Sequence, residues 1–425
     1  MRVSAMYVSL ALCVLAVTGL ACRKKVTEAH FRMDDGLRVD LVSTPRGEKA
    51  AVAILFEIGA DHDPPGRSGM ARLVEHLFTT AGPAGKPART IEEVAGQYGH
   101  DFHARTGADY TLYAIEAPAG RLMAEIDDAA LRMSRLTVVE SDLTREKKRL
   151  VAEVAAAEKD AASAAMNRAA EAVRPTRGAG LRGGIASQIE AMTLDEVEAF
   201  RLAHYGGLTA RLIVAGHFDL DEATKRIRRA FADVPGGKPP QARAPSGSSV
   251  TGTLVMGDAP QAMALAVPPP DHKDALYPAF LVLAARLAAP EGAARVWKAD
   301  FAPLARPDVL LVTSPTPAGQ PAEPAAAAMR AEITTLVKAP LADGEAERAI
   351  ERYGGVLGMT PLSAEACAAE PVEMAFAAGR RAQLGIDGAA LAQAARAVTQ
   401  DQVAAAAQRF DSTHSAAVIA GGKID

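Results

Sequence analysis

The fold is decided by residues 59–78, which read GADHDPPGRSGMARLVEHLF. The first part of this stretch is a loop rich in Gly, Pro and Asp. The second part predicts a helix from Met70 to Phe78, because apolar residues recur at the spacing of one buried helical face. Arg72, Glu75 and His76 share another face of that helix, at i, i+3 and i+4. The segment therefore predicts a loop followed by a helix that carries one polar cluster.

The polar face of this helix offers half of a zinc-binding arrangement. A helix with His at i and i+4 can place two imidazoles on one zinc, with a carboxylate at i+3 as general base. Here Glu75 and His76 are present, and Arg72 stands at the first position. By itself, one Glu-His pair on a helix is more often ordinary surface or core than a metal site.

Two segments downstream add polar residues in order. Residues 144–154 read TREKKRLVAEV and predict a helix on which Glu146 and Glu153 share one face, seven residues apart. Between the two helices, residues 99–111 read GHDFHARTGADYT, which includes His103 and Ala104.

The two halves of the chain contain similar sequence segments. Residues 193–205 read TLDEVEAFRLAHY and precede a β-branched run, RLIVAG, at 211–216. Near the end, TQDQVAAAAQRF at 399–410 precedes AAVIAG at 416–421. Each copy begins with a threonine that is a plausible N-cap and continues into a strand. A helix followed by a strand can recur by chance, but the match favours duplication of a whole domain.

These patterns define the domain organisation that we expect. The length of 425 residues suits two domains, and a Pro- and Gly-rich linker over 236–249 separates them. The predicted domains span 30–235 and 250–425, and each mixes strands with helical segments. The fold class is therefore α+β, with mixed sheets covered by helices.

Taken together, the ordered motifs resemble the M16 family of zinc peptidases (insulinase, pitrilysin and mitochondrial processing peptidase). Residues 59–76 resemble the family's loop and His-x-x-Glu-His helix, 144–154 its third-ligand helix, and 99–111 its substrate-binding edge strand. The resemblance covers roughly residues 30–425, although its specific motifs precede residue 220. It implies two homologous M16-like domains (LuxS/MPP-like) that enclose a cleft.

The resemblance assigns roles to particular residues. It makes Glu75 the general base, which is vestigial if no metal binds, and it makes His76 and Glu153 zinc ligands. Glu146 becomes a carboxylate that orients the zinc ligands without binding the metal itself. His103 and Ala104 fall on the strand that binds extended substrate.

Arg72 departs from the family pattern, because it replaces the first ligand. A guanidinium is always protonated and has no lone pair for a metal. We expect Arg72 to pair with Glu75, Glu146 or Glu153, so zinc is expected only if the protein is active and no cofactor is expected with Arg72. His103, His100, His62 and His30 are weaker candidates for a replacement ligand. Arg352-Tyr353 could correspond to a substrate-positioning pair, but ordinary surface is favoured.

The N-terminal segment is predicted to be a signal. Arg2 precedes an apolar run from Val8 to Leu20, which is too short to span a membrane. Residues 1–22 therefore read as a signal peptide, with export to the periplasm or the bacterial cell envelope. Cys22 stands where a lipoprotein would be acylated; an incidental cysteine and an uncleaved anchor are the alternatives. Any membrane attachment would come only through this segment or a lipid.

Composition limits the function classes. A net charge of −4 gives no reason to expect nucleic acid, and 4% aromatic residues provide few stacking platforms. Three hypotheses remain. The favoured one is an inactive M16-like subunit that binds a peptide or unfolded segment and pairs with an active M16 peptidase or a second copy. The others are a zinc metalloendopeptidase with an unusual ligand set and a structural envelope scaffold.

Overall fold

The computed structural model describes residues 26–174, 183–239, 250–257, 260–288, 296–305, 308–316, 320–361 and 369–421. The first half contains, in chain order, β1 (Thr27–Arg32), β2 (Arg38–Ser43), β3 (Lys49–Phe56), α1 (Met70–Thr80), β4 (Gly82–Pro83), α2 (Ile91–Tyr98), β5 (Phe102–Thr106), β6 (Thr111–Pro118), α3 (Leu122–Arg135), β7 (Leu136–Thr137), α4 (Glu140–Lys159), α5 (Ala161–Val173), α6 (Ala186–Glu190), α7 (Leu194–His204), β8 (Ala210–Gly216) and α8 (Leu220–Ala230). The second half contains β9 (Gly252–Met256), β10 (Pro260–Val267), α9 (Tyr277–Ala288), β11 (Lys298–Phe301), β12 (Leu310–Pro315), α10 (Ala322–Val337), α11 (Glu345–Leu357), α13 (Pro371–Leu384), α14 (Gly388–Arg396), α15 (Gln400–Ala407) and β13 (Ala416–Gly421).

The first half is built on a sheet of six strands in the order β1-β2-β8-β3-β6-β5. β2 runs parallel to β8, and the remaining neighbours are antiparallel. β3 is central and buried along nearly its whole length, which explains its apolar run KAAVAILF. β5 lies at the edge of this sheet, as expected for residues 102–106.

The second half repeats this topology. Its sheet has the order β9-β13-β10-β12-β11, which matches β2-β8-β3-β6-β5 strand for strand. The one parallel pair, β9 with β13, falls at the equivalent place. The predicted N-caps are also present, because the hydroxyls of Thr193 and Thr399 accept the amides of Glu196 and Gln402. The expected duplication of an α+β unit is confirmed.

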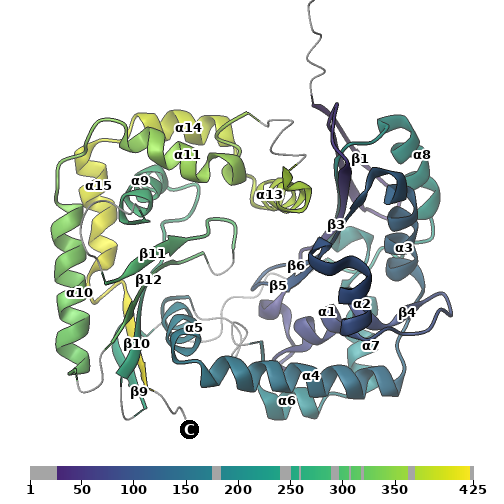
Figure 1. The fold of residues 1–425 in the computed structure, drawn as a ribbon, viewed down its shortest axis with the longest axis horizontal. Helices are drawn as coiled ribbons and strands as arrows, with labels where there is room; N and C mark the ends of the chain where they lie inside the picture. The colour runs from purple at the N-terminus through teal and green to yellow at the C-terminus, as the bar shows by residue number, and fades with distance from the viewer. Residues whose placement is uncertain are drawn as a thin grey trace, which may run out of the picture.

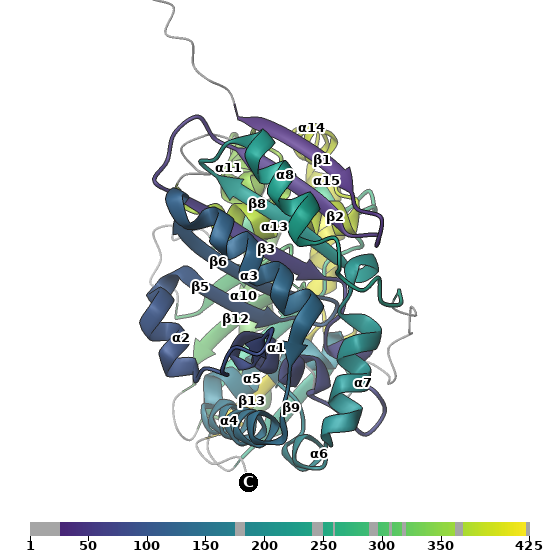
Figure 2. The same ribbon diagram turned by 90° about the vertical axis from the view of Figure 1, so that its right-hand side faces the viewer.

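The two halves exchange helices. α5 belongs to the first half in sequence, but its alanine face packs on β10 and β13 of the second sheet. Conversely, α13 of the second half packs on β3 and β8 of the first sheet. Figure 1 shows both helices between the two sheets, and Figure 2 shows the helices that cover the outer face of the first sheet. Each sheet is therefore covered on one face by a helix from the other half.

A buried arginine fixes α13 against the turn that joins β5 to β6. Arg380 is fully buried, and its guanidinium lies 3.0 Å from the Asp109 carboxylate and 4.4 Å from the centre of the Tyr110 ring. The Gln383 side chain donates to the Asp109 carbonyl at 3.2 Å. This contact holds the edge of the first sheet to the second half.

The predicted signal (1–22), Cys22 and most of the linker lie outside the described residues. In the described part of the chain, no helix is both long and apolar enough to cross a membrane.

Candidate functional site

The helix that carries the polar cluster begins at a tightly defined loop. Gly69 adopts a left-handed backbone (φ 100°) directly before α1, a conformation that favours glycine. The buried Asp63 carboxylate accepts the backbone amides of Gly69 at 2.6 Å and Ala71 at 2.8 Å, which caps the helix. Burial raises the pKa of Asp63 to about 7, although these hydrogen bonds oppose the shift. The predicted apolar face of α1 is buried.

Arg72 forms the ion pair that its position predicts. Its Nη2 atom donates to Oε2 of Glu153 on α4 at 2.9 Å, and both side chains are about one-third exposed (34% and 35%). Burial alone would lower the pKa of Arg72, but attraction to Glu75 and Glu153 raises it above the usual arginine value. The guanidinium therefore remains charged beside the carboxylate.

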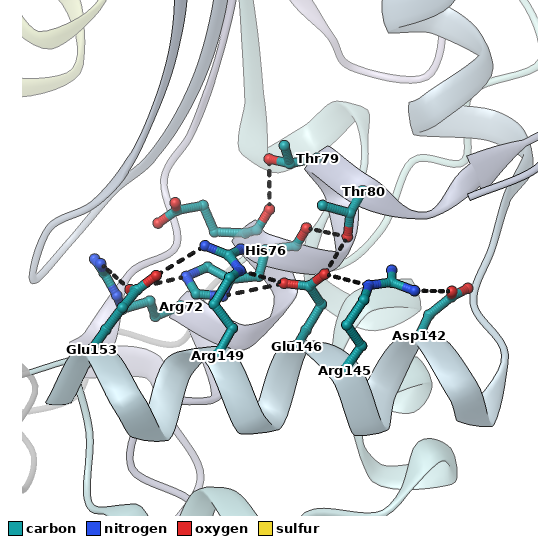
Figure 3. Close-up of polar contacts among 10 residues, drawn as sticks. Arg72, His76, Thr79, Thr80, Asp142, Arg145, Glu146, Arg149 and Glu153 are labelled. Carbon is teal, nitrogen blue, oxygen red and sulfur yellow. Dashed lines mark hydrogen bonds and ion pairs between the residues drawn. The ribbon is translucent and has the colours of Figure 1, made fainter. Parts of the chain in front are cut away.

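A second arginine, Arg149 on α4, occupies the other side of the same carboxylates. Its Nη1 atom donates to Oε1 of Glu153 at 2.9 Å, and its Nε atom donates to Oε2 of Glu146 at 2.7 Å. Arg149 thus bridges the two glutamates, as Figure 3 shows. Both oxygens of Glu153 are hydrogen-bonded to guanidinium groups.

His76 lies between the two glutamates and is almost completely buried. Its Nε2 atom is 3.5 Å from Oε2 of Glu153, and its Nδ1 atom is 3.6 Å from Oε2 of Glu146. The Nδ1 atom has no hydrogen-bond partner within the described residues. Burial raises the pKa of Glu153, but contact with His76 and Arg72 outweighs it and lowers that pKa to about 2.

Glu146 is the most enclosed carboxylate of the cluster, with 1% of its side chain exposed. Its Oε1 atom accepts the Thr80 hydroxyl at 2.9 Å and Nε of Arg145 at 3.1 Å. Together with Arg149, these donors satisfy a buried charge that would otherwise be costly.

Glu75 turns away from the other carboxylates. Its Oε2 atom accepts the hydroxyl of Thr106, at the end of β5, at 2.5 Å, and the residue is 5% exposed. Arg72 interacts with Glu75 through its charge but donates its hydrogen bond to Glu153. The helix and the edge strand are therefore joined at the site by Glu75 and Thr106.

The backbone of β5 presents hydrogen-bonding groups at the open edge of the sheet. The amide of Gly107 donates to the Tyr110 carbonyl at 2.9 Å, which marks these two as a hydrogen-bonded pair. Hydrogen-bonded pairs alternate along an antiparallel ladder, so His103 and Arg105 bond to β6 and the amide of Ala104 points outward. In the described residues, no backbone outside the ladder bonds to residues 102–106.

The weaker histidine candidates lie elsewhere or face away. The His62 ring accepts the amide of Gly59 within the loop, and His30 on β1 bonds to Asp40 at 2.8 Å. His103 shares a face of β5 with Arg105, opposite the face on which Thr106 meets Glu75. The side chain of His100 lies outside the described residues. Tyr353 is buried in the second half, where its ring packs edge-on against Phe301, so Arg352-Tyr353 is not at this site.

Two family models match the chain in succession. The model for insulinase (peptidase family M16) matches residues 38–181, which contain the whole polar cluster. The model for the peptidase M16 inactive domain matches residues 191–353. The chain belongs to the M16 peptidase family.

Curated relatives and solved structures agree with membership of the M16 family. The chain is 28% identical over 243 residues to coenzyme PQQ synthesis protein F of Pseudomonas aeruginosa, covering 56% of this chain and 30% of that protein. It is 23% identical over 211 residues to an uncharacterized zinc protease of Rickettsia bellii, covering 49% of this chain and 50% of that protein. The chain thus spans half or less of the length of these relatives.

Two solved structures share the M16 fold over nearly the whole chain. A protease from Helicobacter pylori superimposes with a TM-score of 0.74 at 18% identity, covering 93% of this chain and 100% of that one. The periplasmic protease PqqL from Escherichia coli gives a TM-score of 0.66 at 16% identity, covering 93% of this chain and 48% of that one.

Zinc, the metal named for M16 relatives, does not fit the residues at this site. A catalytic zinc takes three protein ligands and keeps one position open. Here the resemblance leaves two protein ligands, His76 and Glu153, because Arg72 stands in place of the third, and both Glu153 oxygens accept guanidinium hydrogens. Within the described ranges, no three His, Cys, Asp or Glu side chains are grouped so as to hold a metal.

Three residues of the site were not anticipated from the sequence. Arg149 stands three residues after Glu146 and four before Glu153, a helical spacing that could have identified it. Thr106 and Asp63 contact α1 from a strand and a loop, and no local pattern predicts such contacts.

Proposed function

We propose that this chain is a non-catalytic member of the M16 family that binds extended peptide segments without a metal. The proposal rests on the two arginines that bond to Glu153. Arg72 donates to one carboxylate oxygen and Arg149 donates to the other, each at 2.9 Å. Charged arginines at these positions neutralise the acidic cluster in place of a metal ion. Their positive charge repels a metal ion, and their hydrogen bonds occupy both carboxylate oxygens of Glu153.

The capacity for peptide binding rests on β5. This strand lies at a sheet edge and directs the amide of Ala104 outward, which suits the addition of a peptide as a further strand. His103 and Ala104 would then take part in peptide binding, because both lie on this strand. A peptide-binding subunit would use this edge, whereas a purely structural scaffold would not.

An active zinc peptidase is the second candidate, favoured by one observation. Nε2 of His76 and Oε2 of Glu153 are 3.5 Å apart, close to the separation of two ligands on one zinc, and Glu75 precedes His76 in α1. For this function, Arg72 and Arg149 would both have to release Glu153 before zinc could bind.

We also propose that the protein is exported and acts in the cell envelope. The apolar segment from Val8 to Leu20 and the periplasmic location stated for PqqL support this location. The PqqL chain, of which this chain covers 48%, supports pairing of this chain with an active M16 peptidase or with a second copy. Acylation at Cys22 predicts that Cys22→Ser moves the protein from the membrane fraction to the soluble fraction, since anchoring depends on the acyl chains. Unchanged fractionation would contradict acylation.

Peptide binding in the presence of a chelator tests the proposed function. An acetylated and amidated octapeptide of alternating Val and Thr should bind the untagged protein equally well with and without EDTA, and it should remain uncleaved. Loss of binding in EDTA, or cleavage that stops in Glu75→Gln, would support the zinc peptidase. A protein that binds none of a panel of extended peptides would favour the scaffold.

A further inference from the structure

The two faces of β5 point toward different partners. Ala104 packs against the core beneath α1, and Thr106 bonds to Glu75 on that helix. The alternate residues, His103 and Arg105, therefore project toward the second half of the molecule. This face of β5 carries the Arg105 guanidinium, to which the resemblance to M16 zinc sites assigns no role.

Arg105 already binds an acidic side chain from the other half. Its Nη2 atom donates to Oε1 of Glu373, in the first turn of α13, at 2.7 Å. Its guanidinium also lies 4.3 Å from the centre of the Phe376 ring. Arg105 and Glu373 remain 38% and 46% exposed, so the pair is accessible from solvent. An exposed ion pair of this kind is weak and can exchange partners.

We propose that β5 selects peptides with acidic side chains on alternate residues, and that Arg105 is the residue that sets this preference. The inference rests on the proposed peptide binding at β5. In the absence of peptide, Glu373 occupies the guanidinium as an internal substitute for the acidic side chain.

The geometry of strand addition supports this preference. A peptide paired antiparallel to β5 would bond to the outward groups of Ala104, so its residue opposite Arg105 would form a non-hydrogen-bonded pair. Side chains are closest in such pairs, and opposite charges there stabilise the pairing. The next peptide side chain on the same face would lie beside His103, which can donate a hydrogen bond to a carboxylate. A peptide with lysine at these two positions would instead face the Arg105 charge.

The experiment compares three capped octapeptides of alternating Val and Thr, with two Glu, two Gln or two Lys at alternate positions. Dissociation constants are measured by fluorescence anisotropy at one fixed ionic strength. The Glu peptide should bind about 1.5- to 5-fold more tightly than the Gln peptide, and the Lys peptide should bind most weakly. Glu373→Gln should enlarge the preference for Glu, because the internal competitor is gone. Arg105→Gln should abolish it.

Arg135 and Asp233 provide matched controls, because they form an exposed ion pair (61% and 75% exposed, 3.3 Å) away from β5. Arg135→Gln and Asp233→Asn should leave the three affinities in their original order. Equal binding of all three peptides by the unmodified protein would overturn the inference while leaving peptide binding intact. Failure of even the Gln peptide to bind, in both the unmodified protein and Glu373→Gln, would contradict the peptide-binding function and the inference together.

Discussion

At the scale of single residues, the site is an acidic cluster neutralised by arginine. Glu146 and Glu153 approach His76 from α4, and without a cation such carboxylates would repel each other. The resemblance to M16 enzymes led us to expect an ion pair between Arg72 and one of three glutamates, and the structure shows that Glu153 accepts the hydrogen bond. The bridge formed by Arg149 follows from helical spacing, but the resemblance drew attention to the glutamates alone.

The low pKa of Glu153 makes the contribution of Arg72 to stability depend on pH. Because the folded-state pKa is about 2, below the ordinary value, this contribution is complete above about pH 5 and lost as pH falls toward 2. Arg72→Gln should lower the free energy of unfolding by about 1 kcal/mol or less at pH 7, since both partners are one-third exposed. Urea denaturation from pH 7 to pH 2.5 should show the difference shrinking as pH falls. A difference that grows in acid would contradict the ion-pair account.

At the scale of secondary structure, β5 is the element on which the functional proposals depend. The sequence predicted an edge strand at this position from its resemblance to M16 enzymes. It did not predict which backbone groups face outward, because that depends on the turn at Gly107 and Tyr110. A one-residue change of register would exchange the faces of His103 and Ala104.

A proline substitution in β5 tests which of its backbone amides face outward and which bond to β6. Ala104→Pro removes an outward amide and leaves the ladder with β6 intact, so the fold should persist, as proline is tolerated in edge strands. Affinity for the uncharged octapeptide should fall about 2- to 10-fold, the worth of one hydrogen bond. The measurement is fluorescence anisotropy, with circular dichroism to monitor folding.

His103→Pro is the matched control, because it removes an amide that bonds to β6. It should cost about 1–3 kcal/mol of unfolding free energy. If Ala104→Pro destabilises the fold as much as His103→Pro does, the assignment of the outward edge is wrong.

At the scale of the whole molecule, duplication could be predicted and helix exchange could not. The repeated helix and strand at 193–216 and 399–421 identified two related units, and the matching strand orders confirm them. The packing of α5 on the second sheet and α13 on the first involves residues far apart in sequence. An alanine-rich helix such as α5 has no local feature that specifies its partner.

Arg380 is the residue through which we expect the two halves to be coupled. Arg380→Met should lower the free energy of unfolding by about 3 kcal/mol, because the Leu304 carbonyl and the Asp109 carboxylate both lose their contact with the buried guanidinium. Urea unfolding should also become less cooperative. Arg396→Met, at an exposed position on α14, should change stability by less than about 0.5 kcal/mol. Equal effects of the two substitutions would contradict the role of Arg380.

The zinc content of the purified, untagged protein tests the central claim most directly. After dialysis against buffer with micromolar zinc, mass spectrometry should find far less than one zinc per chain in the unmodified protein. The Arg72→His/Arg149→Ala variant should approach one zinc per chain, because it restores a third ligand and frees Glu153. Arg72→His alone should remain intermediate, since Arg149 still holds Glu153. Stoichiometric zinc in the unmodified protein, together with peptide cleavage that Glu75→Gln abolishes, would contradict the account.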